Sequence, residues 1–176
     1  AQAQDSLRAA GAGLVPLEFA PLAEIMGDSG ILYTAEAWAH WRDEITARGE
    51  VMFAPIRERF AAGAAANASD YIAAWQRLRR VRAAWHEATA GFDAVLLPTA
   101  ANLPPKADRL MELGDYYVTE NLLTLRNTRI GNLLGLCAVT LPVPGHASCG
   151  AMLMGAPMAE ARLLRLAAGA EAALRA

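Results

Sequence analysis

Apolar residues recur every three or four positions along several stretches of the chain, which is the spacing of one buried helix face. One such stripe runs from residue 31 to residue 48. A second long stripe follows Ser69, a suitable N-cap residue, and ends at Gly91. A third keeps approximate helical spacing before Gly135, as a helix followed by a short helical turn. The sequence predicts helices over residues 1–10, 31–48, 69–90, 119–134 and 163–174.

Short apolar runs bounded by Gly and Pro lie between these helices and predict strands. Pro98, Pro142 and Gly155 stop three of the runs. We expect an α/β fold in which the strands share one mixed sheet covered by helices, with no internal boundary in residues 1–176. The predicted strands cover residues 14–19, 93–97, 137–141 and 150–154.

Composition and charge narrow the classes of function. Apolar residues make up 55% of the 176 residues, enough for a sizeable core. The net charge of −2 offers no general attraction for nucleic acid or anionic membranes, and no apolar run reaches the length of a membrane span. Two cysteines, Cys137 and Cys149, are too few for a disulfide framework, which favours a cytoplasmic setting. The opening AQAQDSLRAAGAG has no initiator Met and no targeting segment, so we expect a fragment of a longer protein.

Three segments, in their order and spacing, carry a resemblance to a known family. They are FDAVLLPTA around Asp93 through Thr99, NLLGLCAVTLP over Asn132 through Pro142, and the closing run from Gly150 to Glu171. Together they resemble the C-terminal third of amidase signature enzymes. The resemblance implies the C-terminal portion of the amidase signature fold, from an enzyme that hydrolyses carboxamide C–N bonds.

The sequence departs from the family's pattern at three positions. Cys137 stands where Pro is common after Gly-Leu, and Ser148 and Met152 stand where Pro and Gln are common. These departures suggest a divergent subfamily and weaken any inference about the substrate.

The catalytic residues that the resemblance implies are not in this chain. The family uses a Ser nucleophile, a second Ser in a cis peptide and an unprotonated Lys, without a cofactor or a metal. The only lysine is Lys106, and no serine lies in a Gly-Ser-Ser context. We therefore expect the triad to lie upstream, Lys106 to be a solvated loop residue, and the isolated chain to be inactive.

The loop after the strand at 93–97 is the best candidate for a substrate site. A strand that stops at Pro98 places Pro98 and Thr99 at the rim of the sheet, where polar groups can meet a substrate. By resemblance the segment 124–132 covers the same cleft. Its candidates for orienting a polar substrate group are Arg126, Asn127, Thr128 and Asn132. The alternative is that Thr128 and Asn132 cap the turn before Gly135.

Other arrangements that suggest chemistry have simpler explanations. His146 and Cys149 invite a thiol-hydrolase interpretation, but a turn residue and a small apolar residue entering a strand explain them as well. His40 and Glu44 lie one helical turn apart without a third metal ligand, and Trp41 would mark the buried side. Four arginines favour a solvated helix face over a nucleic-acid patch, namely Arg77, Arg79, Arg80 and Arg82.

The expected partners follow from the fragment interpretation. They are a small-molecule amide substrate, the missing N-terminal catalytic part, and a second copy of the chain. The second copy would contact residues 93–99 and 127–141, which the missing part would otherwise cover. The alternative function is a non-catalytic helical interaction module. A Ser-Ser-Lys arrangement in the upstream sequence would favour the amidase, and its absence would favour the interaction module.

Overall fold

The computed structural model describes residues 1–176, which form two compact units. The sheet unit comprises Ala1–Phe19 and Trp85–Ala176, and the helical unit comprises Ala20–Ala84. The assignment of residues 1–176 to a single domain of a larger fold stays a prediction.

The sheet unit contains three strands, β1 (Val95–Pro98), β2 (Cys137–Pro142) and β3 (Gly150–Gly155), in the order β1-β3-β2. The α/β class and these three strands are confirmed. Both pairings are antiparallel, so the sheet within this chain is not the mixed sheet that we expected. The reason is that β2 and β3 are joined as a hairpin and β1 pairs with the free side of β3, with no parallel neighbours.

The strand expected at 14–19 is wrong, because these residues are not in any sheet. Pro16 has no backbone N–H to donate to a strand ladder. Phe19, the last apolar residue of this run, packs on an aromatic ring instead of pairing in a sheet. It meets Trp85 edge to face, with ring centroids 5.2 Å apart. The apolar run reflects this packing.

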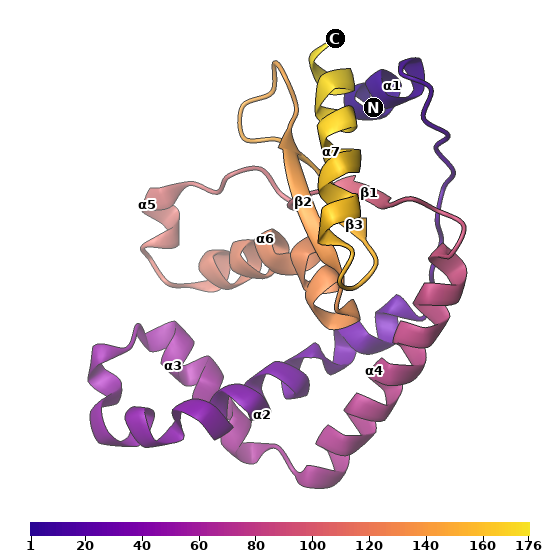
Figure 1. The fold of residues 1–176 in the computed structure, drawn as a ribbon. Coiled ribbons are helices and arrows are strands. Elements are labelled where there is room, and N and C mark those ends of the chain that lie inside the picture. Colours follow the sequence, from indigo (N-terminus) through magenta and orange to yellow (C-terminus); the bar gives the residue numbers. More distant parts are fainter. The chain divides into compact units, whose positions relative to one another are not determined.

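Helix α7 (Glu160–Arg175) covers one face of the sheet, and α1 (Gln2–Ala9) packs against α7 (Figure 1). Leu163, Ala167 and Leu174 of α7 share a buried cluster with Ala151 and Leu153 of β3. Since side chains alternate along a strand, Met152 and Met154 point to the opposite face and are also buried there. Burial on both faces explains why β3 is a continuous apolar run in the sequence.

Helix α6 (Asp115–Leu134) brings its C-terminal turns to that second face. A side chain at Gly131 would lie 3.4 Å from the Met154 methyl group, so the helix approaches the strand closely. Gly135 ends the helix in the left-handed conformation, with φ of 69°. The Gly135 and Leu136 amides donate to the Asn132 and Gly131 carbonyls. The predicted helix end is thus confirmed, while the helix begins four residues earlier than predicted and is continuous.

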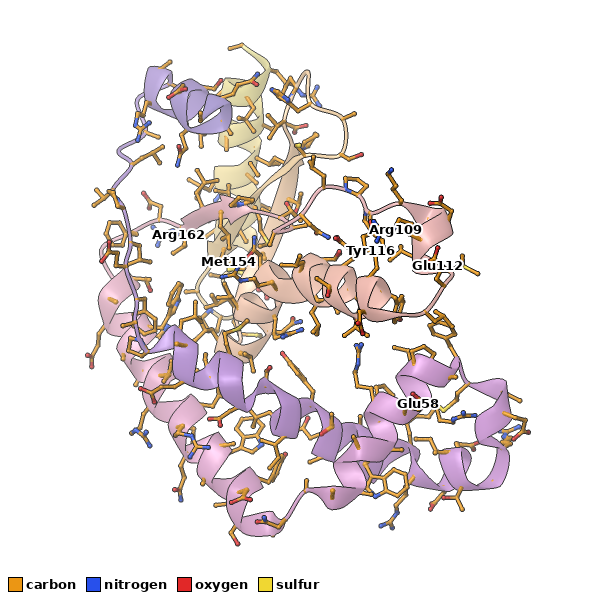
Figure 2. The ribbon with its side chains drawn as sticks, turned by 180° about the vertical axis from the view of Figure 1, so that it is seen from behind. Glu58, Arg109, Glu112, Tyr116, Met154 and Arg162 are labelled. Carbon is orange, nitrogen blue, oxygen red and sulfur yellow. The ribbon has the colours of Figure 1, made fainter.

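The start of α6 is tied to the short helix α5 (Ala107–Leu110). The Tyr116 hydroxyl accepts a hydrogen bond from the Lys106 amide at 3.1 Å. The guanidinium of Arg109 lies 3.8 Å from the centre of the Tyr116 ring. Both residues are labelled in Figure 2. Lys106 itself is exposed.

The helical unit consists of α2 (Leu22–Arg48), α3 (Ala54–Ala61) and most of α4 (Ala68–Thr89), with the short 3-10 helices η1 (Gly49–Val51) and η2 (Ala62–Ala65) between them. Helix α2 begins nine residues before its predicted start. Asn67, and not Ser69, caps α4, because the Asn67 side-chain carbonyl accepts the Asp70 amide at 2.9 Å.

Two close contacts hold α2 against its neighbours. Gly63 of η2 lies so near α2 that a Cβ atom there would be 1.9 Å from the Thr34 carbonyl oxygen. Arg77 of α4 donates two hydrogen bonds, of 2.7 and 2.8 Å, to the carboxylate of Asp28. These hydrogen bonds hold the pKa of Asp28 below its ordinary value.

The remaining charged residues that the sequence singled out have local partners or lie in solvent. Glu44 accepts a hydrogen bond from Arg48 at 2.7 Å. Arg82 lies over the ring of Trp75. Trp41, expected on the buried side of α2, is 49% exposed. No helix in the structure is both long and apolar enough to span a membrane.

Candidate functional site

The candidate site lies where β1 and β2 end. Both strands run antiparallel to β3, so they point in the same direction and finish at the same end of the sheet. Pro98 lies opposite Ala151, and Pro142 lies opposite Gly150. Proline has no backbone N–H to donate to a neighbouring strand, so the chain leaves the sheet after both prolines.

A groove of about 820 Å³ opens at this end. Its walls come from the loop Pro98–Leu103, from Thr140 and Pro142 of β2, and from the hairpin segment 146–150. No Asp, Glu, Lys or Arg lines it. The volume lies within the range of small-molecule sites, roughly 300–1,000 Å³.

Two threonine hydroxyls meet in the wall of the groove. Thr99 Oγ1 and Thr140 Oγ1 are 3.1 Å apart, and the Thr99 amide donates to the Gly150 carbonyl at 3.0 Å. A Cβ atom at Gly150 would lie 2.5 Å from Thr99 Oγ1 and 2.7 Å from Thr140 Cγ2. Only a residue without a side chain leaves room for this pair.

Helix α6 fixes one wall of the groove through Asn102. The side-chain nitrogen Nδ2 of Asn102 donates to Glu120 Oε2 at 2.6 Å and to Thr124 Oγ1 at 3.1 Å. The Thr124 hydroxyl is also within 3.2 Å of the Asn102 side-chain carbonyl. Asn102 is therefore oriented from behind by two polar residues of the helix.

The predicted site residues divide into two groups. Pro98 and Thr99 line the groove. Asn127 reaches it indirectly, because its side-chain nitrogen donates to the Pro98 carbonyl at 2.8 Å.

The other three candidates do not line the groove. Arg126 and Asn132 are exposed on α6, and the Thr128 hydroxyl donates to the Leu125 carbonyl of its own helix at 3.2 Å. Asn102 and Thr140 line the groove but were not predicted. For Thr140 the sequence holds one signal: it follows the apolar Val139 along β2, and side chains alternate between the two faces of a strand. The Thr140 hydroxyl is therefore expected on the face opposite to Val139.

The β2–β3 hairpin contains His146 and Cys149, the two residues whose types suggest thiol chemistry. The His146 amide donates to the Val143 carbonyl, and the Cys149 amide donates to the His146 carbonyl, which forms a tight turn. Ser148 adopts a positive φ of 63° within this turn. His146 is exposed and Cys149 is half-buried, and both line the groove.

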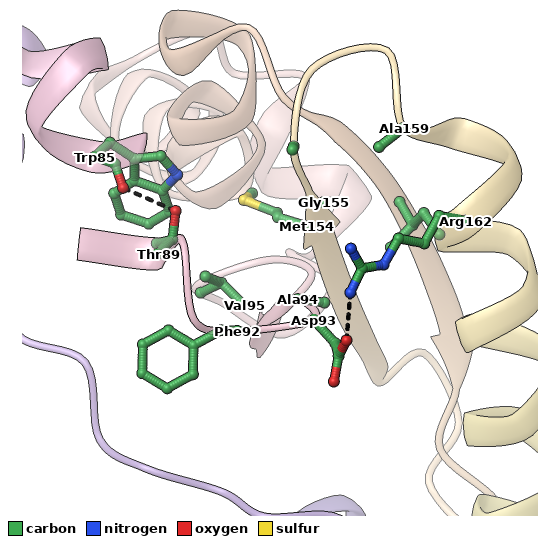
Figure 3. A pocket seen from close by; sticks show the side chains of 12 residues that line it. Trp85, Thr89, Phe92, Asp93, Ala94, Val95, Met154, Gly155, Ala159 and Arg162 are labelled. Carbon is green, nitrogen blue, oxygen red and sulfur yellow. Dashed lines mark hydrogen bonds and ion pairs between the residues drawn. The ribbon is translucent and has the colours of Figure 1, made fainter. Parts of the chain in front are cut away.

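A second, smaller cavity of about 70 Å³ lies between the β1–β3 pair and the start of α7 (Figure 3). Trp85, Met154 and Leu163 form its apolar wall. Asp93 and Arg162 join in an ion pair beside it, and both side chains are exposed. No further polar side chain in this cavity points to a ligand.

A sequence model of the family described as Amidase matches residues 1–164. The chain belongs to the amidase family. Among curated members, it is 45% identical over 85 residues to a 2-amino-5-chloromuconic acid deaminase of Comamonas testosteroni, a match that covers 46% of this chain and 18% of that protein. It is 34% identical over 108 residues to a fatty acid amide hydrolase of Oryza sativa subsp. indica, covering 58% of this chain and 18% of the hydrolase.

Solved amidase-family structures share the fold. The allophanate hydrolase of Kluyveromyces lactis superposes with a TM-score of 0.85 at 21% identity, over 98% of this chain and 29% of that one. This likeness shows the fold alone. The chain thus spans less than a third of the length of these amidase-family proteins.

Proposed function

We propose that the chain is the scaffold and part of the substrate cleft of an amidase that hydrolyses carboxamide C–N bonds. The reaction uses a Ser, a cis-Ser and a Lys that lie outside this chain, upstream of it. The observation that carries the proposal is the groove at the end of β1 and β2, with Thr99 in its wall. Membership of the amidase family supplies the reaction class.

The residues of the chain favour a role in binding over a role in bond cleavage. The groove contains hydroxyl groups, an imidazole and a thiol, but no lysine. Lys106 precedes α5 as an exposed residue, whereas a lysine base must lose its proton through desolvation. The chain therefore binds and orients the amide, and the upstream part activates the nucleophile.

The test joins this chain to an upstream segment that carries a Gly-Ser-Ser and a catalytic Lys, and measures ammonia or amine release from a panel of amides. We expect turnover that Thr99→Val lowers by a rise in KM, since it removes a hydroxyl from the groove. Thr119→Val is the matched control, because Thr119 is exposed on α6 and does not line the groove. The chain alone should release product at the background rate. An inactive joined protein would favour the interaction-module alternative.

We also propose that the chain associates with a second copy when the catalytic part is absent. Both outer strands have one edge without a strand partner in this chain. The large exposed apolar side chains of the sheet unit concentrate over residues 103–125, and not in 93–99 and 127–141 as the sequence suggested. They are Leu103, Met111, Leu113, Val118, Leu122 and Leu125.

A further inference from the structure

We propose that the groove selects amides whose bound group is uncharged and largely apolar, and that it discriminates against a carboxylate-bearing group. This inference rests on the proposed function and names the substrate class of the same site. Its first support is the composition of the walls. Leu103 and Pro142 give the groove apolar surface, and neither a lysine nor an arginine lines it.

The polar groups of the groove match a neutral ligand atom. When one hydroxyl of the Thr99–Thr140 pair donates to the other, a single proton remains for an outside acceptor. The groove adds the Ser148 hydroxyl, the Cys149 thiol and the His146 imidazole, so its polar groups suit an amide, hydroxyl or ether group. A carboxylate would leave water without a lysine or arginine in the walls to offset the cost of its desolvation.

A negatively charged side chain lies directly behind one wall of the groove. Glu120 touches the lining residue Asn102 from the side of α6, with 2.6 Å between Glu120 Oε2 and the amide nitrogen. Its carboxylate raises the free energy of a second negative charge in the groove. A neutral group does not experience this repulsion.

Direct binding to the 176-residue chain tests the proposal. The probes are hexanamide and the monoamide of adipic acid, which have carbon chains of equal length and differ in a terminal carboxylate. Titration of the labelled protein followed by NMR gives the Kd of each probe and the backbone amides that shift. We expect hexanamide to bind at least about tenfold more tightly at pH 7, with shifts at Thr99 and Gly150.

A charge introduced at the rim should reverse this preference. Leu103 is 70% exposed, so Leu103→Arg can add a cation without disturbing the core. We expect this variant to bind the monoamide more tightly than hexanamide. Leu103→Gln, similar in polarity but uncharged, should keep the preference for hexanamide. Thr140→Val should weaken hexanamide several-fold by removing one hydroxyl of the pair.

Three results would overturn the proposal. The native chain could bind the two probes equally or prefer the monoamide, it could bind neither, or the shifts could lie away from the groove. A preference that Leu103→Arg leaves unchanged would also contradict it. Binding needs no catalysis, so the two failures are distinguishable. A joined protein that hydrolyses no amide while this chain still prefers hexanamide would refute the proposed reaction and leave only the binding preference of the groove.

Discussion

Gly150→Ala should destabilise the sheet unit by about 1–3.5 kcal/mol, mainly through the threonine pair. The new Cβ would approach Thr99 Oγ1 to 2.5 Å and Thr140 Cγ2 to 2.7 Å, both well inside normal contact. Both threonines must move to relieve the two clashes, which breaks their 3.1 Å hydrogen bond and costs about 1 kcal/mol. Overpacking adds roughly 1–3 kcal/mol, and replacing a glycine returns about 0.4–1 kcal/mol by restricting the unfolded chain.

A variant protein that lacks the γ atoms of Thr99 and Thr140 tests whether the threonine pair causes the destabilisation by Gly150→Ala. In Thr99→Ala with Thr140→Ala the two shortest contacts at Gly150 are gone and the Cβ of residue 99 remains at 3.2 Å, so the same change should cost less than about 0.5 kcal/mol. Native-state hydrogen exchange at Met152 and Leu153 of β3 reports on the sheet unit alone. Equal destabilisation in both backgrounds would show that the threonine pair does not account for the glycine.

Three further predictions concern the rest of the molecule. Gly63→Ala should lower the free energy of unfolding of the helical unit by about 3 kcal/mol or more, because its Cβ would overlap the Thr34 carbonyl. Gly27→Ala has open space around it and should raise the same free energy by about 0.5–1 kcal/mol. A denaturant titration measures both changes. Because the pKa of Asp28 is lowered in the folded state, Asp28 contributes stability above its ordinary pKa of 3.8, and this stability is lost as pH falls through the lower folded pKa. In Asp28→Asn the stability should therefore depend less on pH in this acid range. Unchanged acid-unfolding curves would contradict the role of Arg77. Sedimentation velocity across a concentration range should show self-association, and a monomer at high concentration would refute it.

Local patterns in the sequence predicted most of the elements. The strand ends at Pro98 and Pro142 and the helix end at Gly135 follow from backbone chemistry that any context preserves, and all three are observed within a residue of their predicted places. The start of α2 was missed because Gly27 and Ser29 resemble a turn. In the structure the Ser29 hydroxyl donates to the Met26 carbonyl of its own helix, at 2.8 Å.

The site was predicted only in part because its members come together through strand register. Pro98 and Thr99 were found from a strand that stops at a proline. Thr140 and Asn102 depend on which strand lies beside which and on where α6 passes, and neither relation has a local signature. Arg126, placed at the cleft by resemblance, lies away from the groove for the same reason: the side of a helix that faces a site is set by tertiary packing.

Apart from Thr140, Pro142 and Gly150, connecting segments bound the groove, while the buried contacts between the sheet and α7 lie elsewhere in the unit. Substitutions in the loop after Thr99 and at residues 146–148 of the hairpin can therefore accumulate with little effect on folding. Ligand preference and thermodynamic stability become separable traits under selection. Exchange of these two segments between homologues is accordingly a direct route to transplanting ligand preference onto an unchanged core.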